Sequence, residues 1–366
     1  MSSVSSVLIR RGTELISARL RYREQSQMHD WLGLSIVIFT ALAFGLAIFW
    51  VDYTCTHVIA TLAAVEDSNP KTYVRLDSED PNDSFDPTDT EVAAASTPKP
   101  ITSGLRSTIK HLRARGGIWS CFRGFRMYLA FTGFDMGVGF LVRAIVPIPI
   151  DSHSLAGSFF GSFFGEFVAS MLLATWQMAW VHLVIADKSP RSSYRRMLGL
   201  RHWPRIAPAA ALYNFLTCAT FSLPTAAAGP AGWAVMAVVT NRGYKGLLGF
   251  LAISILPAVF FLLVSVPARG IFTRVAASML PEEDDPIVPF DRLFGGKVKP
   301  EVVGGSGKLG LRDAWTTFDW AARARYVKVI LKALAIEVAL GVVGILLIIG
   351  ELTLVTPTSQ SSASHS

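Results

Sequence analysis

The feature that most constrains this chain is a set of long apolar runs without charge. Residues 31–51, 206–239 and 246–268 contain no Asp, Glu, Lys or Arg. A hydrocarbon core about 30 Å thick takes roughly 20 apolar residues in a helix, and every backbone polar group must then be satisfied within the segment. A core helix of a soluble protein would be shorter or carry a polar face. The runs therefore predict an integral membrane protein.

Hydropathy predicts an all-α polytopic fold with six transmembrane helices, at 31–61, 127–149, 154–186, 206–228, 246–275 and 329–351. Two connections are short, 150–153 and 229–245, and the three that alternate with them are long. Lys and Arg gather in the long connections, so that side is expected to face the cytosol, or the matrix of a mitochondrion. We expect a multi-pass protein of the mitochondrial inner membrane or of another endomembrane.

Composition divides the rest of the chain. Residues 1–30 are basic and Ser-rich, which fits either a mitochondrial targeting helix or an interfacial helix. The first span region is 31–64, and an acidic insert at 65–106 is predicted to be disordered because it is too polar to bury a core. The other five helices, with amphipathic loops, are expected within 107–353, followed by a disordered tail at 354–366.

Several function classes are disfavoured by the residue content. The net charge is +7, but basic loops in a membrane protein reflect topology rather than nucleic-acid binding. Cys55, Cys121 and Cys218 lie far apart, without a metal-ligand spacing or a disulfide pattern. No HExxH motif, nucleophile elbow or P-loop occurs. We therefore expect neither an enzyme, a cofactor nor a metal site, and the expected partners are the lipid bilayer and a small anionic or polar solute.

Polar side chains inside the predicted spans are candidates for substrate binding. A lone charge near the bilayer centre costs from ~3 to more than 10 kcal/mol, so it should face a partner or water. The candidate cavity residues are Asp135, Arg143, Glu166, Asn214, Lys332 and Glu337. They either line a central aqueous cavity or form static ion pairs, such as Asp135 or Glu166 with Arg143 or Lys332. Arg143 and Lys332 are also close enough to span ends to snorkel.

Three comparable stretches end the odd-numbered spans: FWVDYTCTH, AWVHLVIAD and VPARGIFTR. Trp50, Trp180 and Pro267 head them. Charged or titratable residues follow each head at matching offsets, first Asp52, His182 and Arg269, and then His57, Asp187 and Arg274. The pattern indicates a threefold internal repeat.

With these stretches the chain resembles the mitochondrial carrier family, which has three repeats of two spans. That family's matrix-segment motif is similar to Gly117 followed, after four residues, by Phe122, Arg123 and Gly124. Gly310 and Trp315 match the same motif in part. The resemblance implies a pseudo-threefold, carrier-like six-helix bundle that transports by alternating access. It also implies that the six residues after the heads form a gate network closing the cavity on one side. Only Pro267 keeps the family's proline, and Arg269 stands where an acid is expected, so these residues are alternatively simple interfacial residues at helix ends.

Two functions remain open from the sequence. One is a divergent carrier-like transporter of a small solute, and the other is a non-transporting membrane scaffold or assembly protein. The chain also resembles filamentous-fungal six-span membrane proteins through LPEEDDPIVPFDRLFGG, a resemblance that implies no mechanism. Locally, Gly157, Gly161 and Gly165 predict close helix packing. The stretch GGIWSCFRGF is predicted to turn a surface helix tightly into the second span, with its aromatic residues at the interface.

Overall fold

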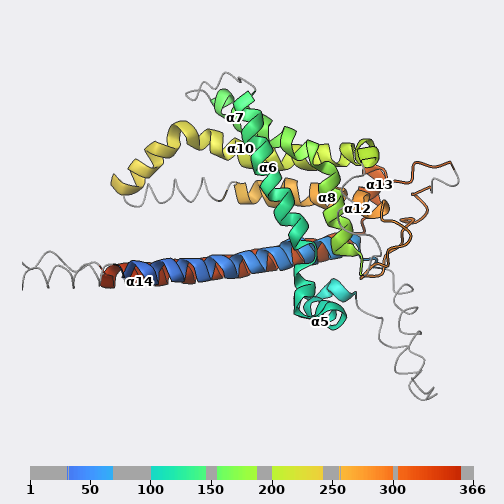
Figure 1. Ribbon diagram of the computed structural model, residues 1–366, viewed down its shortest axis with the longest axis horizontal. Coiled ribbons are helices and arrows are strands. Elements are labelled where there is room, and N and C mark those ends of the chain that lie inside the picture. The colour runs from blue at the N-terminus through green and yellow to red at the C-terminus, as the bar shows by residue number, and fades with distance from the viewer. Residues whose placement is uncertain are drawn as a thin grey trace, which may run out of the picture. The chain divides into compact units, whose positions relative to one another are not determined.

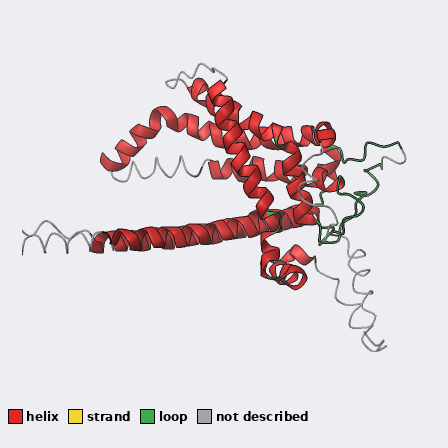
Figure 2. Ribbon diagram, viewed as in Figure 1, coloured by secondary structure: helices red, strands yellow, loops and turns green. Residues whose placement is uncertain are grey.

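The computed structural model describes residues 31, 33–68, 100–145, 155–187, 200–241, 255, 257–299 and 304–355. Regular structure in this part is helical (Figure 2), apart from one isolated antiparallel bridge between Ala186 and Pro286. The predictions for 1–30, for the middle of the acidic insert and for the end of the tail lie outside the described residues.

The N-terminal helix begins at Gly33, and the helical elements from Asp52 onward follow in chain order. They are the π-helical turn η1 (Asp52–Ile59), α2 (Ala60–Val65), the 3₁₀ turn η2 (Ile101–Ser103), α5 (Leu105–Gly116), the 3₁₀ turn η3 (Ile118–Phe122), α6 (Phe125–Ile145), α7 (Leu155–Leu172), α8 (Ala174–Ile185), the 3₁₀ turn η4 (Leu200–His202), α10 (Trp203–Asn241), the π-helical turn η5 (Phe261–Ser265), α12 (Val266–Ser278), α13 (Leu311–Thr316) and α14 (Trp320–Val355).

Four described helices are long and apolar enough to cross a membrane, namely Gly33–Val65, Ile118–Val142, Pro257–Ser278 and Trp320–Leu352. A fifth crossing results if Phe159–Leu172 and Ala174–Ile185, which meet at a 60° bend, form one broken span. The chain is therefore a multi-pass membrane protein. The predicted count of six is not confirmed in the described part, because α10 is not among these candidates.

The chain folds as two compact units, Met1–Tyr53 with Leu331–Ser366, and Thr54–Ile330. In the first unit, the described part of the N-terminal helix lies side by side with the second half of α14 (Figure 1). The Thr40 hydroxyl donates to Glu351 Oε1 at 2.7 Å. Gly344 lies so close to Phe44 that a Cβ there would be 3.0 Å from its ring. The two helices form an antiparallel pair, which we call the helical hairpin.

Large apolar side chains cover the outside of the helical hairpin. On its first helix Phe39, Leu42 and Leu46 are 74%, 60% and 66% exposed, and Ile345 and Leu346 on the second are 59% and 63% exposed. Water would disfavour so continuous an apolar surface, whereas lipid chains solvate it without penalty. The hairpin surface is therefore what the charge-free sequence predicts for helices in lipid.

The second unit is built around α7, which packs against α6 and α10. Gly161 and Gly165 are buried, and a Cβ on Gly139 of α6 would lie 3.9 Å from the Gly165 carbonyl oxygen. The prediction that the glycines form a packing face is confirmed at these two positions, since small residues permit close backbone approach.

The tight turn predicted at GGIWSCFRGF is present. Gly117 and Gly124 have φ of +68° and +72°, a conformation that side chains with a Cβ disfavour, and the 3₁₀ turn η3 lies between them. Trp119 within this turn is 81% exposed. The turn separates basic α5 from apolar α6, as the sequence predicts.

One local prediction was wrong. The connection predicted at 229–245 is helical as far as Asn241, and this apolar segment without charges continues α10 although it contains Gly229 and Pro230. The helical structure is interrupted between α13 and α14. There the Thr317 hydroxyl donates to the Asp313 carbonyl at 2.7 Å, and α14 begins anew at Trp320.

Candidate functional site

The candidate site lies where five helical elements of the second unit meet. A cavity of about 70 Å³ is lined from η1, α6, α8, α10 and α12. Its lining residues are His57, Tyr128, Phe131, Gln177, Trp180, Val181, Tyr213, Arg269, Phe272 and Thr273. One lining segment deviates from regular α-helix, because His57 lies within the π-helical turn η1, and a second π-helical turn, η5, directly precedes α12. Such π turns often mark functional positions, because they turn side chains out of α-helical register.

Arg269 and His57 form the polar centre of this cavity. Arg269 Nη2 lies 2.9 Å from His57 Nδ1. A guanidinium can only donate, so Nδ1 accepts and the imidazole carries its proton on Nε2. Arg269 is only 7% exposed, and no described residue places a carboxylate within ion-pair distance of it. The site therefore holds a buried positive charge without an internal counter-charge among the described residues.

A pair of side-chain amides borders the same cavity. Gln177 Nε2 donates to Asn214 Oδ1 at 3.0 Å, and Asn214 Nδ2 donates to Gln177 Oε1 at 3.2 Å. Both residues are buried, so this reciprocal pair satisfies amides that would be costly to bury alone. The pair fixes the position of Gln177, which lines the cavity.

Aromatic rings form most of the remaining wall. The His57 ring centroid lies 4.9 Å from that of Tyr128 and 6.0 Å from that of Trp180. Tyr213 stacks on Phe272 with centroids 5.5 Å apart and an interplanar angle of 22°. The cavity thus combines one cation with an apolar, aromatic enclosure.

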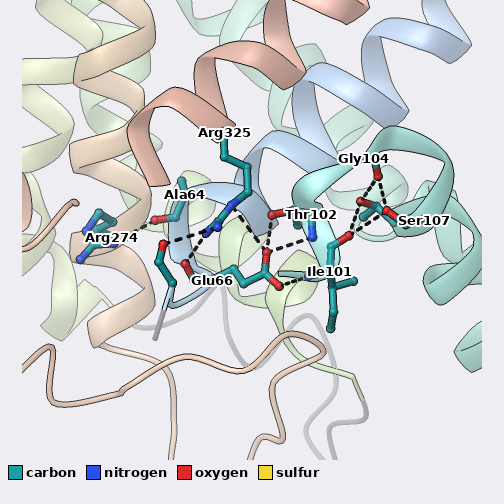
Figure 3. A network of polar contacts seen from close by, with 10 residues as sticks. Ala64, Glu66, Ile101, Thr102, Gly104, Ser107, Arg274 and Arg325 are labelled. Carbon is teal, nitrogen blue, oxygen red and sulfur yellow. Dashed lines mark hydrogen bonds and ion pairs between the residues drawn. The ribbon is translucent and has the colours of Figure 1, made fainter. Parts of the chain in front are cut away.

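Beyond the cavity, near the C-terminal ends of α2 and α12, Arg274 connects the two helices (Figure 3). Its guanidinium donates to the Ala64 carbonyl at 3.0 Å, to the Ala314 carbonyl at 3.1 Å and to both oxygens of Thr317. The group also lies between the rings of Phe294 and Phe318, 4.7 and 5.0 Å from their centroids. Arg274 acts as a clamp that joins α2, α12 and α13.

Glu66 forms a second closing contact (Figure 3), in which its buried carboxylate accepts the backbone N–H of Ile101 at 2.6 Å and that of Thr102 at 3.0 Å. It also accepts the Thr102 hydroxyl, and Arg325 Nε lies 3.8 Å from Oε2. The predicted insert at 65–106 is thus corrected at both margins, because Glu66 and the segment from Ile101 are ordered and packed. Hydrogen bonds to an ionised carboxylate are stronger than neutral ones, so Glu66 stabilises the packing of the segment from Ile101 against the end of α2.

The loop after α12 runs along the ends of two other helices. Asp187 N–H donates to the Asp285 carbonyl at 2.6 Å, and Ile287 N–H donates to the Ile185 carbonyl at 2.8 Å. Further on, Asp67 N–H donates to the Pro289 carbonyl at 3.1 Å. We call residues 281–290 the strap, because this segment ties the end of α8 to the end of α2.

A larger pocket of about 260 Å³ adjoins the clamp. Glu66 and Arg274 line it, and Asp291, also in its wall, accepts the backbone N–H groups of Leu293 and Gly295. These charged groups are engaged within the protein. We therefore place the candidate site at the smaller cavity, whose cation has no opposite charge beside it among the described residues.

The six predicted gate residues have different contacts, and their role as a gate network stays a prediction. Of these residues, His57 and Arg269 contact each other directly. His182 Nε2 donates to the Ala276 carbonyl at 2.8 Å, whereas Asp187 pairs with Arg115 at 3.3 Å and with Arg123 at 3.6 Å. Asp52 belongs to the first unit and lies near Glu337, and Arg274 binds carbonyls rather than an acid.

The three predicted heads differ in their surroundings. Trp50 is 48% exposed in the first unit, Trp180 lines the cavity and Pro267 lies in the first turn of α12. Their pseudo-threefold arrangement stays a prediction. The structure suggests another correspondence, Val65 with Ile185, because each ends a helix and is followed two residues later by an aspartate bonded to the strap.

The predicted cavity residues fall into separate places. Asn214 borders the cavity through Gln177. Asp135 accepts a hydrogen bond from Ser170 at 3.2 Å and lies close enough to Glu166 for mutual repulsion. Lys332 is exposed in the first unit, and the side chain of Arg143 lies outside the described residues. An ion pair of Asp135 with a base, one of the two alternatives left open by the sequence, does not occur among the described residues.

Sequence reasoning missed most of the cavity wall. Tyr128, Tyr213, Phe272 and Thr273 carry no local signal, because aromatic residues are equally common in lipid-facing and buried positions of membrane helices. Gln177 carries a usable signal, since an amide within an apolar helix requires a polar partner. Searching for such amides would have paired it with Asn214.

In the part of the chain that the structure describes, no metal cluster of three or more His, Cys, Asp or Glu side chains occurs, and no disulfide joins any of the three cysteines. No protein-family model matches this chain, and neither does any curated protein or solved structure.

Proposed function

We propose that this protein is a divergent, carrier-like membrane transporter that moves a small solute by alternating access. The observation that carries the proposal is Arg269, buried in a cavity between helices without a counter-charge among the described residues. An ionisable group inside a membrane protein is expensive to maintain, so its presence favours a role in handling a solute.

The helix arrangement supports the carrier-like part of the proposal. α2, α8 and α12 end the first, third and fifth predicted spans, and each of the three packs against the other two. His57, just before α2, Gln177 in α8 and Arg269 in α12 line the cavity. Each comes earlier in the chain than the contacts of the Arg274 clamp and the strap at the ends of these helices. A solute in the cavity therefore has a closed barrier on the side where these helices end.

Alternating access requires that this barrier open. The Arg274 clamp, the Glu66 contacts and the strap would have to separate together, since they tie the same helix ends. Individual hydrogen bonds contribute about 1 kcal/mol each, so binding of a solute has to supply part of the free energy of opening. In this proposal the described conformation is the one closed at the helix ends.

A membrane scaffold or assembly protein is the second candidate. The same dense contacts favour it, because a clamp with four hydrogen bonds and a strap bonded to two helices suit a permanently closed structure. A scaffold would tolerate loss of Arg269 far better than loss of Arg274.

Reconstitution into liposomes separates the two candidates. We expect the wild-type protein to exchange a labelled solute from a broad panel of small metabolites in a saturable way. Arg269→Gln should abolish exchange, whereas Arg312→Gln, at an exposed position, should leave it unchanged. The absence of exchange across the panel, together with stable co-purifying proteins, would favour the scaffold.

A further inference from the structure

The cavity around Arg269 has the composition of an anion site. One of the five N–H donors of this side chain bonds His57, and the residue lines the cavity. Burying a cation without a counter-charge is costly, and an anion entering the cavity would remove that cost. Carboxylates match a guanidinium fork in geometry as well as in charge.

The walls limit which anion fits. Tyr128, Trp180, Tyr213 and Phe272 present aromatic surface, and Arg269 is the charged side chain among the described residues of the lining. A second negative charge on the ligand would therefore meet no second cation among these residues. A cavity of about 70 Å³ is also small, roughly half the volume of an engineered protein cavity that binds benzene.

From this geometry we infer that the cavity binds a short-chain monocarboxylate, with the carboxylate on Arg269 and the apolar body against the aromatic rings. The identity of this anion as the transported solute rests on the proposed function, whereas its binding does not. Dicarboxylates and phosphate dianions are excluded by charge, and long-chain acids by size. Val181, which is fully buried in the cavity wall, limits the length of the apolar body.

Equilibrium binding to the purified full-length protein in detergent tests the inference. Sodium propionate should raise the apparent melting temperature in a saturable way, because a ligand that binds only the folded state stabilises it by mass action. Sodium succinate, phosphate and chloride at equal ionic strength should not. Arg269→Gln should weaken propionate binding about ten- to hundredfold, the range expected for loss of a charged hydrogen bond, and Arg312→Gln should leave it unchanged.

A second variant keeps the test decisive if Arg269→Gln does not fold. Val181→Ala leaves Arg269 in place and enlarges the cavity, so it should shift the preference from propionate towards butyrate or valerate. A merely structural role of Arg269 predicts no such change in chain-length preference. Equal stabilisation by succinate or phosphate, or unchanged propionate binding in Arg269→Gln, would overturn the inference.

The same experiments distinguish this inference from the proposed function. Propionate binding without flux in liposomes would leave the site standing and remove the transport function. Flux of another solute that persists in Arg269→Gln, with no propionate binding, would keep transport and reject the site.

Discussion

At the scale of single residues, two buried arginines in α12 have opposite environments. Arg274 donates four hydrogen bonds to Ala64, Ala314 and Thr317, and its guanidinium lies over two aromatic rings. Arg269, little more than one helical turn earlier, has His57 as its hydrogen-bond partner among the described residues. A satisfied arginine stabilises a fold, whereas one with unused donors is available to a ligand. This contrast is why we assign structure to the first and function to the second.

Arg274→Lys tests the structural assignment. Lysine keeps the charge but concentrates its donors at one atom, so it cannot reach three carbonyls, and it does not stack between rings as a guanidinium does. Leaving buried carbonyls without donors should cost roughly 3 kcal/mol, measured as a lower apparent melting temperature in detergent. Arg312→Lys on exposed α13 is the matched control and should be neutral. An unchanged melting temperature for Arg274→Lys would show that the clamp does not stabilise the helix ends.

At the scale of elements, the turn between α5 and α6 positions a wall of the cavity. A Cβ on Gly124 would lie 3.1 Å from Trp180 Cδ1, whereas one on Gly117 would have nothing within 4 Å. Both glycines have positive φ, so alanine at either position should destabilise the protein by roughly 1–3 kcal/mol. Only Gly124→Ala should also displace Trp180.

Fluorine NMR of protein containing 5-fluorotryptophan measures this displacement. The Trp180 resonance, assigned with Trp180→Phe, should shift in Gly124→Ala and stay in place in Gly117→Ala. A shift of equal size in both variants would mean that backbone strain, rather than contact with the ring, moves Trp180.

The helical hairpin offers a second test at this scale. Gly344 lies against Phe44, but a Cβ on Gly341 would have nothing within 4 Å. Gly344→Ile should therefore push the helices apart, while Gly341→Ile should not. Spin labels at the exposed positions Leu42 and Leu346 report the separation. An unchanged distance in Gly344→Ile would contradict the close pairing of these helices.

The elements also show which parts of the structure the sequence predicts. Charge-free runs predicted the apolar helices, and glycines predicted the turn at Gly117, because both signals are local. The contacts of Glu66 with Thr102 and Arg325 join residues distant along the chain, and no local sequence pattern predicts them. The repeat offsets selected both Arg269 and Arg274 as gate residues. They could not distinguish the two, since the difference lies in acceptors supplied by other helices.

At the scale of the whole molecule, the fold and the proposed site depend on the solvent around the apolar helices. Phe39, Leu42, Leu46 and Leu346 are far more exposed than their chemistry allows in water. In lipid the same surface is expected, and a buried cation such as Arg269 then has no access to water as a substitute for a counter-ion. Both the fold and the proposed site therefore follow from insertion in a bilayer.

Alkaline carbonate extraction of membranes from cells expressing the full chain measures this insertion directly. Peripheral and soluble proteins are released at high pH, whereas helices that cross the bilayer keep a protein in the pellet. We expect the protein in the membrane pellet, released only by detergent. Recovery of the protein in the alkaline supernatant would contradict insertion, because the exposed apolar helices would then lie outside the bilayer.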